Sequence, residues 1–423
     1  MKELTVSGPS ASRVCWDNLE AFARQQIQTF LQRLLEEEVT LLLGREKSAR
    51  RDLEAAEAGA PETAYRNGHG KPRRLTTPCG TIEVRRPRVR GLTERFESRI
   101  LPLFKRRTQA VDRLLPELYL HGLAAGDFDL ALRGLLGEGA PLSPSSLLRL
   151  KAEWHQEYTA WTERDLSELR VVYLWADGVY VKAGLEKEKA ALLVVIAALE
   201  DGRKVVLAVR SGQRESTESW SELLRELKKH GLACPKLVIA DGHLGLWGAL
   251  ANVYPEAGEQ RCWNHRLVNV LDKVSKSKQP QAKVWLRQLM YAETRERATE
   301  LKGKFQAWCR QQGCAAAGEL LDGDWERLVA YYDYPAEHWK HLRTTNPVES
   351  PFDRVRLRTN ASRRFKRSEH ATAVVWKTLL IAEKRFRKVN APELLVGVLL
   401  GTPYVNGRRM HFPGDGQGVK VAA

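Results

Sequence analysis

The sequence predicts a mixed α/β protein with one sheet and helical regions before and after it. Between residues 171 and 262, apolar and β-branched runs alternate with stretches of helical spacing. Residues 17–43 keep apolar positions at helical spacing, and residues 263–342 are rich in Leu, Ala, Lys, Arg, Gln and Trp. At 423 residues the chain is long enough for two to four structural units.

The composition indicates a folded protein with a polyanionic partner. Its 43% hydrophobic and 28% charged residues argue against a disordered chain. There are 68 Lys and Arg against 52 Asp and Glu, a net charge of +16. Nucleic acid is favoured because each cation that meets a phosphate releases a condensed counterion. A membrane is the alternative, but the longest apolar run, 190–199, has half the length of a spanning helix.

The sequence also limits the compartment and the cofactors that we expect. The opening MKELTVSGPS has no apolar stretch after its lysine, so we expect no signal peptide and a cytoplasmic, nucleoid-associated protein. Six scattered cysteines favour reduced thiols over a disulfide framework. The chain contains no Walker-type loop and no GxGxxG after a strand, so a nucleotide cofactor is not expected.

Three regions are expected before the sheet. Region 1–60 is helical, and its apolar stripe needs either another helix of the chain or a second copy, as in a homodimer. Region 61–100 holds a predicted hairpin with its turn at Pro78-Cys79-Gly80. Residues 66–90 carry one acid, Glu83, and eight cations, for which we favour phosphate contact over a solvated ribbon: Arg66, Lys71, Arg73, Arg74, Arg85, Arg86, Arg88 and Arg90.

Region 101–165 is predicted to hold three helices, with breaks near 122–126 and 137–141. The third begins at Leu142-Ser143-Pro144, with Ser143 as N-cap and Pro144 in the first turn. Short helices with tight turns form either a DNA-binding helix-turn-helix or an ordinary small bundle. We interpret region 101–165 as a helix-turn-helix-like DNA-binding domain, with the ordinary bundle as the alternative.

Region 166–262 is predicted to be the sheet-containing core. Three strands come first, the last two joined by a turn at Asp201-Gly202, followed by a helix at 217–230, the strand KLVIAD and a helix near 244–253. This order is that of a ribonuclease H-like core. Residues 263–342 are then an all-helical insertion, 343–392 are helices that complete the core, and 393–423 are a tail.

Two aspartates in this core are candidates for metal binding. Asp177 lies within or at the end of an apolar strand, where an ionised carboxylate is costly unless it is paired or binds a cation. Asp241 ends KLVIAD directly before a helix, and ligands gather at the carboxyl ends of strands in open α/β sheets. Two acids on neighbouring strands could share divalent cations, which prefer oxygen ligands.

Four stretches carry a family resemblance: WADGVYVKA, VIADGHLGLWGAL, EQRCWNHRLVNVLDKV and YPAEHWKHLRTTNPVES. Over residues 60–390 the chain resembles the Mutator-like bacterial insertion-sequence transposases, a branch of the DDE transposases. The resemblance implies a ribonuclease H-like core with a helical insertion, the acids Asp177, Asp241 and Glu349, and a Cys-x2-His signature at Cys262 and His265.

The resemblance also implies an activity and its partners. Such a transposase binds the terminal inverted repeats of its own element and target double-stranded DNA, and it cleaves and joins strands with two Mg²⁺ ions, for which Mn²⁺ can substitute. The family's route passes through excised circular DNA made by copying. A ribonuclease H-like nuclease and a catalytically inactive DNA-binding regulator are the alternatives.

Several candidate residues have more than one interpretation. Glu349 is a metal ligand or part of a helix cap in which Asn346 is the N-cap. Cys262 and His265 either join His338 and His341 in a zinc site, support the acids together with Asn346, or simply pack at the start of the insertion.

More DNA contacts are expected around the third acid. Trp339 and Arg343 are candidates to stack on a base and to grip a phosphate. Residues 354–367 contain seven cations and no acid, and we expect them to contact DNA beside the scissile phosphate: Arg354, Arg356, Arg358, Arg363, Arg364, Lys366 and Arg367.

Overall fold

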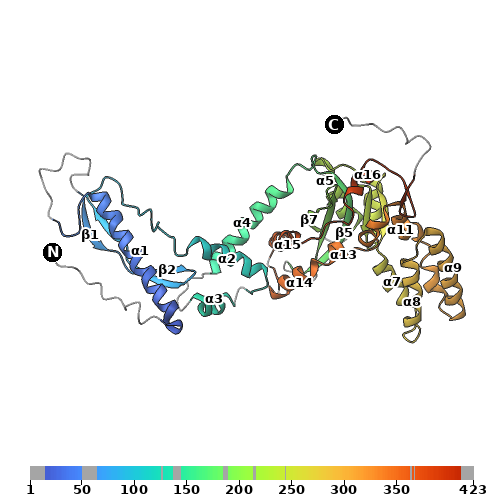
Figure 1. The fold of residues 1–423 in the computed structure, drawn as a ribbon, viewed down its shortest axis with the longest axis horizontal. Helices are drawn as coiled ribbons and strands as arrows, with labels where there is room; N and C mark the ends of the chain where they lie inside the picture. Colours follow the sequence, from blue (N-terminus) through green and yellow to red (C-terminus); the bar gives the residue numbers. More distant parts are fainter. Residues whose placement is uncertain are drawn as a thin grey trace. The chain divides into compact units, whose positions relative to one another are not determined.

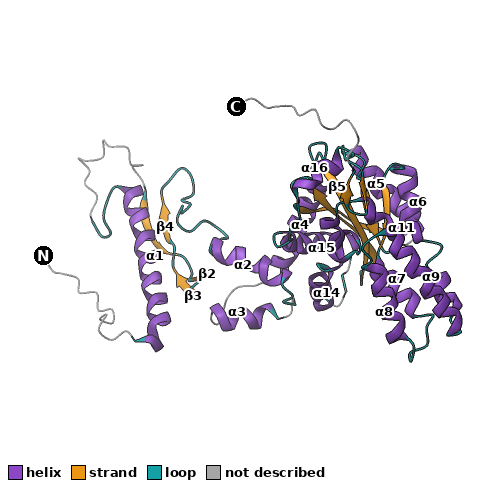
Figure 2. Cartoon of the chain, turned by 45° about the vertical axis from the view of Figure 1, so that its right-hand side comes forward, coloured by secondary structure: helices purple, strands orange, loops and turns teal. Residues whose placement is uncertain are grey.

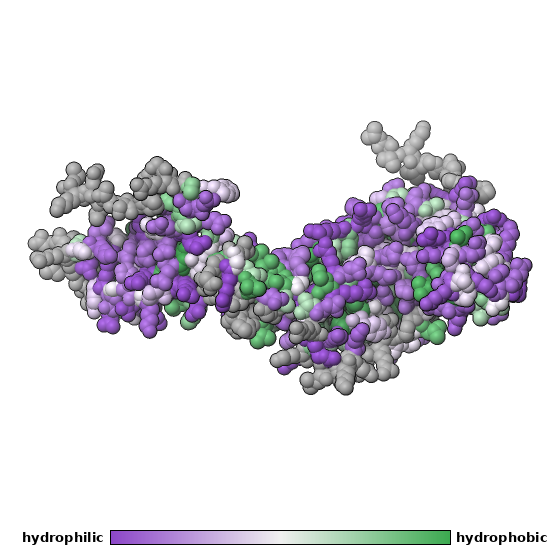
Figure 3. All heavy atoms as spheres, turned by 90° about the horizontal axis from the view of Figure 1, so that it is seen from below, coloured by the Kyte–Doolittle hydropathy of each residue, from purple (hydrophilic) through white to green (hydrophobic). Residues whose placement is uncertain are grey.

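The structure is a computed structural model that describes residues 15–49, 64–124, 127–136, 144–183, 189–212, 216–242, 244–362, 364–365 and 367–410. The chain divides into two compact units, residues 1–149 and 150–423, each described by itself. Figure 1 shows the elements in chain order and Figure 2 their type. Every helix in the described ranges is too short or too polar to cross a membrane, and hydrophilic residues cover most of the face drawn in Figure 3.

The N-terminal unit packs one long helix on short β-ribbons. A 3₁₀ turn, η2 (Trp16–Asn18), leads into α1 (Leu19–Leu43). Two antiparallel pairs follow, β1 with β4 and β2 with β3. Their strands are β1 (Tyr65–His69), β2 (Arg73–Thr77), β3 (Gly80–Val84) and β4 (Pro87–Arg90). The predicted hairpin is confirmed as β2–β3, whereas the β1–β4 pair was not predicted.

The apolar stripe of α1 finds its partner within the chain. Leu35 of α1 is buried in a cluster with Leu75, Ile82, Val84 and Leu101, and Ile27 and Leu31 pack against it. The Gln32 amide adds two hydrogen bonds of 2.9 Å to the backbone N–H and carbonyl of Arg85. For these residues the partner lies within the chain, as the first interpretation has it, but the expected helix is wrong, because the partner is a β-ribbon.

Three helices follow, as predicted: α2 (Gln109–Leu120), α3 (Phe128–Leu136) and α4 (Pro144–Thr162). The ring of Tyr119 on α2 lies 6.3 Å from that of Phe128 on α3, and both rings are buried. Ser143, the predicted N-cap of the third helix, lies outside the described residues.

The C-terminal unit contains a five-stranded mixed sheet in the order β7-β6-β5-β8-β9. The first three strands are antiparallel, and β8 and β9 add in parallel beside β5. The strands are β5 (Val171–Val181), β6 (Ala190–Leu199), β7 (Lys204–Gly212), β8 (Leu237–Ala240) and β9 (Gly258–Arg261). Four of them were predicted; β9, with the polar sequence GEQR, was not.

Helices cover both faces of this sheet. On one face α5 (Thr217–Lys229) and α6 (Leu244–Val253) bury Trp220 and Leu250 against Leu174, Ala176 and their neighbours. Alternate residues of a strand point to opposite faces, so Tyr173, Trp175 and Asp177 face the other way. There the hydroxyl of Tyr173 bonds to His338 at 2.8 Å.

Within the described residues, every element between 263 and 342 is helical, as predicted. The elements are α7 (Trp263–Leu271), α8 (Gln279–Met290), α9 (Arg295–Gln311), α10 (Ala315–Glu319), α11 (Trp325–Val329), η3 (Ala330–Asp333), η4 (Ala336–His338) and α12 (Trp339–Leu342). They belong to the same compact unit as the sheet.

The remaining elements complete this unit. They are α13 (Asn346–Glu349), α14 (Phe352–Ala361), α15 (Ser368–Glu383), α16 (Glu393–Leu399), β10 (Tyr404–Val405) and β11 (Arg408–Arg409). The region expected to be a tail is therefore folded as far as residue 410. Gly407 donates to the Tyr332 carbonyl at 3.0 Å and accepts from the Ala336 N–H at 3.2 Å.

Two glycines of this unit give opposite predictions. Gly202 in the β6–β7 turn has φ +82, and an added Cβ would lie 2.7 Å from the Cβ of Pro392. Gly303 lies within α9 with open space around it. We expect Gly202→Ala to lower the free energy of unfolding by about 1 kcal/mol or more and Gly303→Ala to raise it by roughly 0.5–1 kcal/mol. Chemical denaturation of both variants tests this, and equal shifts would contradict it.

Candidate active site

The two central strands carry Asp177 and Asp241 side by side. In the parallel pair β5–β8, Ala176 lies opposite Ala240; Asp177 is the next residue of β5, and Asp241 directly follows the end of β8. Adjacent strands are about 4.8 Å apart, so the two acids occupy neighbouring positions. Asp177 lies within β5 because the strand continues on its other side, where Asp177 pairs with Val194 of β6.

Asp177 is electrostatically strained in the absence of a cation. Its pKa is raised from 3.8 to about 7, chiefly because burial disfavours the charged form. The charges of Asp241 and Glu349 raise it further, whereas the Gly178 N–H, 2.7 Å from Oδ1, and the His265 charge oppose the rise. These mutual effects show that the three acids and His265 share one electrostatic neighbourhood.

Glu349 reaches this neighbourhood from the short helix α13. The Thr345 hydroxyl hydrogen-bonds to Glu349 Oε1, and Glu349 N–H donates to the Thr345 carbonyl at 3.0 Å. His265 Nδ1 lies 3.7 Å from the same carboxylate oxygen. Helix α13 packs against β5 and β6, which directs the third acid toward the strand that bears Asp177.

The predicted cap at Asn346 is corrected by one residue. The N-cap of α13 is Thr345, Asn346 is already helical, and the helix has no side-chain cap. The Asn346 carboxamide oxygen instead accepts a hydrogen bond of 3.2 Å from the side chain of Asn264, the second residue of α7. The capping-box interpretation of Glu349 therefore loses its N-cap partner.

Cys262 ties this network to the sheet. Its backbone N–H donates to Ala240 O at 2.7 Å, so α7 starts beside the end of β8. Its buried sulfur accepts from the Thr345 N–H at 3.3 Å and lies 3.1 Å from the Thr345 hydroxyl oxygen. The ligand atoms of Cys262, His265 and Glu349 all lie within 4.8 Å of one another.

His265 supplies a positive charge in this cluster. Its pKa is raised from 6.5 to about 9, mainly by the hydrogen bond with Cys262 and further by the charges of Cys262, Glu349 and Asp241, against the effect of burial. The ring is therefore protonated at neutral pH when no metal is bound, and it offsets part of the negative charge.

The four-residue zinc interpretation does not hold. Both ring nitrogens of His338 have protein partners, Tyr173 Oη and the Ala391 carbonyl. His341 Nε2 lies 3.1 Å from the Asn390 side chain. Neither histidine belongs to the candidate metal-binding group that the described residues form. His338 and His341 repeat the two-residue gap between Cys262 and His265 in the sequence, but in the fold they do not join that pair.

Trp339 and Arg343 have packing roles, which revises the expected base contact. Trp339 is 8% exposed, and its indole N–H donates to the Tyr334 carbonyl at 2.9 Å. The Arg343 guanidinium lies over three aromatic rings, those of Tyr291, Tyr331 and Trp339, at 4.8–5.2 Å from their centres. A nucleic-acid base could reach the Trp339 ring only if this cluster opened.

The basic segment after Glu349 is divided between core and surface. Arg358 is 1% exposed because it shares a face of α14 with Phe352 and Val355 at three-residue spacing, so its expected DNA contact is corrected. Arg354 is half-buried, Arg356, Arg364 and Arg367 are exposed, and Arg363 and Lys366 lie outside the described residues. Phe365 N–H bonds to Lys182 O at 2.9 Å, which fastens this segment beside the end of β5.

The hairpin cations of the N-terminal unit are also divided. Lys71, Arg74, Arg85 and Arg88 are exposed. Arg66 bonds instead to the Arg45 carbonyl at 3.0 Å and to the Thr40 hydroxyl at 2.6 Å. Arg73 donates to the carbonyls of Pro102 and Lys105, and Arg86 is half-buried.

Two contributors were missed from the sequence. Thr345 bonds to both Cys262 and Glu349; its place four residues before the third acid, one helical turn away, was the available signal. Arg261 lies so close to Gly242 that a Cβ there would be 2.3 Å from its guanidinium, and its charge interacts with Asp241. The Asp241-Gly242 pair was the signal for that close approach.

Comparison with known proteins adds the family. The family model of the Mutator transposases matches residues 9–388. The chain belongs to the Mutator family of transposases. It is 43% identical over 305 residues to the transposase of insertion sequence IS6120 from Mycolicibacterium smegmatis, covering 72% of this chain and 94% of the relative. The predicted family is confirmed.

Other transposases match at lower identity. The transposase of IST2 from Acidithiobacillus ferrooxidans is 38% identical over 291 residues, 68% of this chain and 98% of the relative. The transposase of ISRM5 from Rhizobium meliloti is 30% identical over 358 residues, 83% of this chain and 85% of the relative. The similarity thus covers most of both chains in each comparison.

The raised pKa of Asp177 predicts a pH dependence of stability. Because the folded-state pKa of Asp177 lies above 3.8, the contribution of this residue to the free energy of unfolding is fully present below pH 3.8. It is lost as the pH rises through about 7. At about 1.4 kcal/mol per pKa unit, this loss is at most roughly 4 kcal/mol. Asp177→Asn should therefore gain stability relative to wild type, in metal-free buffer, more at pH 8 than at pH 4.

Asp201→Asn is the matched control, because Asp201 also precedes a glycine. Hydrogen bonds to Arg203 lower the pKa of Asp201, so the contribution of Asp201 to stability is lost as the pH falls. Asp201→Asn should therefore lose stability relative to wild type, more at pH 8 than at pH 4. Thermal unfolding at both pH values in EDTA measures the two effects. If the stability change of both variants depended on pH in the same direction, the raised pKa assigned to Asp177 would be contradicted.

Proposed function

We propose that this member of the family is a DDE transposase in which Asp177, Asp241 and Glu349 hold the catalytic metal. The observation that supports the proposal is that these three carboxylates share one electrostatic neighbourhood at the sheet. Two of them follow paired residues on adjacent strands, and the third reaches them from a helix against β5. Their charges act on one another, since Asp241 and Glu349 both raise the pKa of Asp177.

We propose two Mg²⁺ ions as the cofactor, with Mn²⁺ as a substitute, because the three acids are oxygen donors. Carboxylate oxygens are the ligands that these hard cations prefer, and a divalent cation would offset the burial and the neighbouring charges that raise the pKa of Asp177. When bound, such ions activate an attacking oxygen and stabilise a leaving oxygen in phosphoryl transfer.

The protein's own residues position the acids. The Gly178 N–H holds one oxygen of Asp177, and Thr345 orients Glu349 while it bonds to the Cys262 sulfur. His265, protonated at neutral pH, lies against Glu349 and compensates part of the charge. In this proposal Cys262, His265 and Asn346 support the ligands rather than bind the ions.

The strand arrangement supports a ribonuclease H-like core. An antiparallel run of three strands is followed by two parallel additions on the far side of β5. The helical stretch 263–342 separates Asp241 from Glu349 in the chain, as the proposed insertion requires. We place the DNA-binding surface on the exposed cations of the N-terminal unit and on Arg356, Arg364 and Arg367.

The proposed substrates are the terminal inverted repeats of the chain's own element and target duplex DNA. The named relatives are transposases of insertion sequences, which favours end joining over the simple cutting of a ribonuclease H-like nuclease. A homodimer would bring two ends together, and exposed apolar residues of α1, such as Phe30 and Leu41, are available for that contact. We propose action in the cytoplasm, at the nucleoid.

Strand cleavage and joining test the catalytic assignment. Purified protein is incubated with Mg²⁺ and DNA that carries the ends of its element, and cleaved and joined strands are separated by gel. Asp177→Asn, Asp241→Asn and Glu349→Gln should each bind DNA and lose cleavage by at least a hundredfold, because each loses an anionic metal ligand at nearly constant volume.

Asp201→Asn is again the matched control and should cleave as wild type does, since Asp201 lies in an exposed turn. Near-native cleavage by any of the three acid variants would remove that residue from the site. Cleavage without joining would favour the nuclease, and DNA binding without either reaction would favour the inactive regulator.

Thr345 gives a second prediction, as a positioning residue. Thr345→Val removes the hydroxyl that bonds to Glu349 and Cys262, whereas Thr345→Ser keeps it. Loss of support for a metal ligand typically costs 10–100-fold in metal affinity or activity. We expect Thr345→Val to need about tenfold or more additional Mg²⁺ for half-maximal cleavage, with rescue at high Mg²⁺, and Thr345→Ser to stay near wild type. Equal Mg²⁺ curves for the two variants would refute the role.

A further inference from the structure

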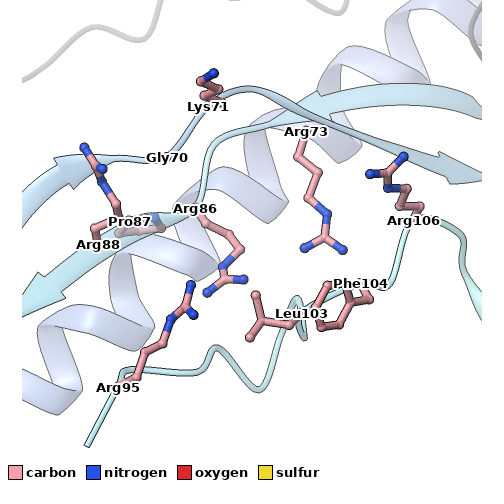
Figure 4. A pocket seen from close by; sticks show the side chains of 10 residues that line it. All are labelled: Gly70, Lys71, Arg73, Arg86, Pro87, Arg88, Arg95, Leu103, Phe104 and Arg106. Carbon is pink, nitrogen blue, oxygen red and sulfur yellow. The ribbon is translucent and has the colours of Figure 1, made fainter.

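A cationic pocket of about 320 Å³ lies in the N-terminal unit (Figure 4). Six of its lining residues are cations and none is an acid: Lys71, Arg73, Arg86, Arg88, Arg95 and Arg106. In Figure 4 the side chains of Arg73, Arg86 and Arg95 extend into the space beside Leu103, whereas Lys71 points away. We name this set of residues, with Leu103 and Phe104, the arginine pocket.

Within the part of the chain that the structure describes, no acid neutralises the positive charge of this pocket. Among the described residues, no carboxylate forms an ion pair with any of the six cations. Arg73 bonds only to neutral carbonyls, and the buried Nε of Arg86 has no hydrogen-bond partner. Burial and the neighbouring charges of Arg86 and Arg106 lower the pKa of Arg73. An anion in the pocket would relieve this repulsion.

Phe104 stands at the rim of the pocket in an unusual state. Its side chain is 90% exposed, and its backbone has φ +68, a region that residues with a β-carbon rarely adopt. A large apolar side chain in this exposed position contributes little to the stability of the fold. A backbone strained by a positive φ often marks a binding site.

The turn that presents Phe104 is fastened at both ends to β2. Arg73 donates to Pro102 O at 3.1 Å on one side of Phe104 and to Lys105 O on the other. The Thr76 N–H donates to Arg106 O at 2.9 Å. The backbone of the turn is therefore fixed next to the cations before any partner binds, which reduces the ordering cost of binding.

We propose that the arginine pocket seats a backbone phosphate of duplex DNA while Phe104 inserts between adjacent base pairs and unstacks them. This inference rests on DNA being the substrate in the proposed function. Apolar wedges beside phosphate-binding cations are a known means of kinking DNA, in which the cost of unstacking is offset by added contacts. The pocket is roomier than a phosphate group alone, so the attached sugar can enter as well.

Fluorescence of 2-aminopurine tests the wedge, because this base brightens when it is unstacked. The probe is a 40-bp duplex from the end of the element that encodes the chain, with 2-aminopurine moved along it, in EDTA so that no strand is cut. Wild-type protein should raise the signal severalfold at one step. Phe104→Ala should abolish the rise while Kd changes less than tenfold, and Phe104→Leu should keep most of it.

Leu400→Ala, a change at a residue that is 75% exposed in the other unit, is the matched control and should behave as wild type. An equal rise for wild type and Phe104→Ala at every position would overturn the wedge. So would a change in oligomeric mass on sedimentation with an unchanged DNA signal, because Phe104 would then be a protein contact.

The salt dependence of affinity tests the phosphate contact. Arg95→Gln with Arg106→Gln, both exposed, should lower the slope of log K against log salt by about 1, since the pocket seats one phosphate and each phosphate contact contributes about 0.9. The double variant should also weaken the fluorescence rise. The matched control changes two exposed cations outside the pocket, Lys47→Gln with Arg113→Gln. Equal loss of slope in both pairs would show general charge attraction and overturn the pocket.

Failure of this inference can be told from failure of the proposed catalysis. The binding assays need no metal and no cleavage. Phe104-dependent unstacking by a protein that never cleaves DNA would leave the wedge standing and remove the DDE assignment. Cleavage and joining without unstacking would remove the wedge and leave the DDE assignment standing.

Discussion

The parallel pairing of β5 with β8 is the constraint on which the candidate site depends. It sets Ala176 opposite Ala240, and both aspartates follow from that register. Repulsion between the acids opposes the arrangement, but all four residues of β8 are at most 1% exposed. Burying a large apolar side chain contributes about 1.5–3 kcal/mol, and Leu237, Val238 and Ile239 together exceed the cost of at most roughly 4 kcal/mol that the raised pKa of Asp177 implies. Hydrophobic burial therefore holds the charges in place.

The third acid depends on the same strand indirectly. Helix α13 has four residues, too few to be stable alone, so its position comes from its contacts. Thr345 bonds to the Cys262 sulfur, and the Cys262 N–H bonds to Ala240 O at the end of β8. A chain of hydrogen bonds thus links Glu349 to the residue that precedes Asp241. This explains why a cysteine, buried and without a disulfide, lies at the start of the helical stretch.

The sequence predicted an element well where its apolar periodicity matches its burial. It predicted less well where contacts between residues distant in the chain determine the structure. Apolar runs predicted β5 to β8, but β9 escaped because its buried Gln260 is satisfied by the distant Leu328 carbonyl and Tyr331 N–H. The acids could be predicted because motif and strand position coincide. Charge counting could not tell that Arg358 faces the core while Arg356, two residues earlier, is exposed.

The partner of each arginine, rather than the number of arginines, indicates where an anion can bind. In the C-terminal unit Arg261 pairs with Asp324 at 2.5 Å, which cancels much of its field. In the arginine pocket, Arg73 bonds to carbonyls that carry no net charge. Such an arginine fastens a turn and still keeps its full positive charge, because the acceptors do not neutralise it. One residue therefore both shapes the pocket and attracts its ligand, so a structural hydrogen bond does not remove an arginine from DNA recognition.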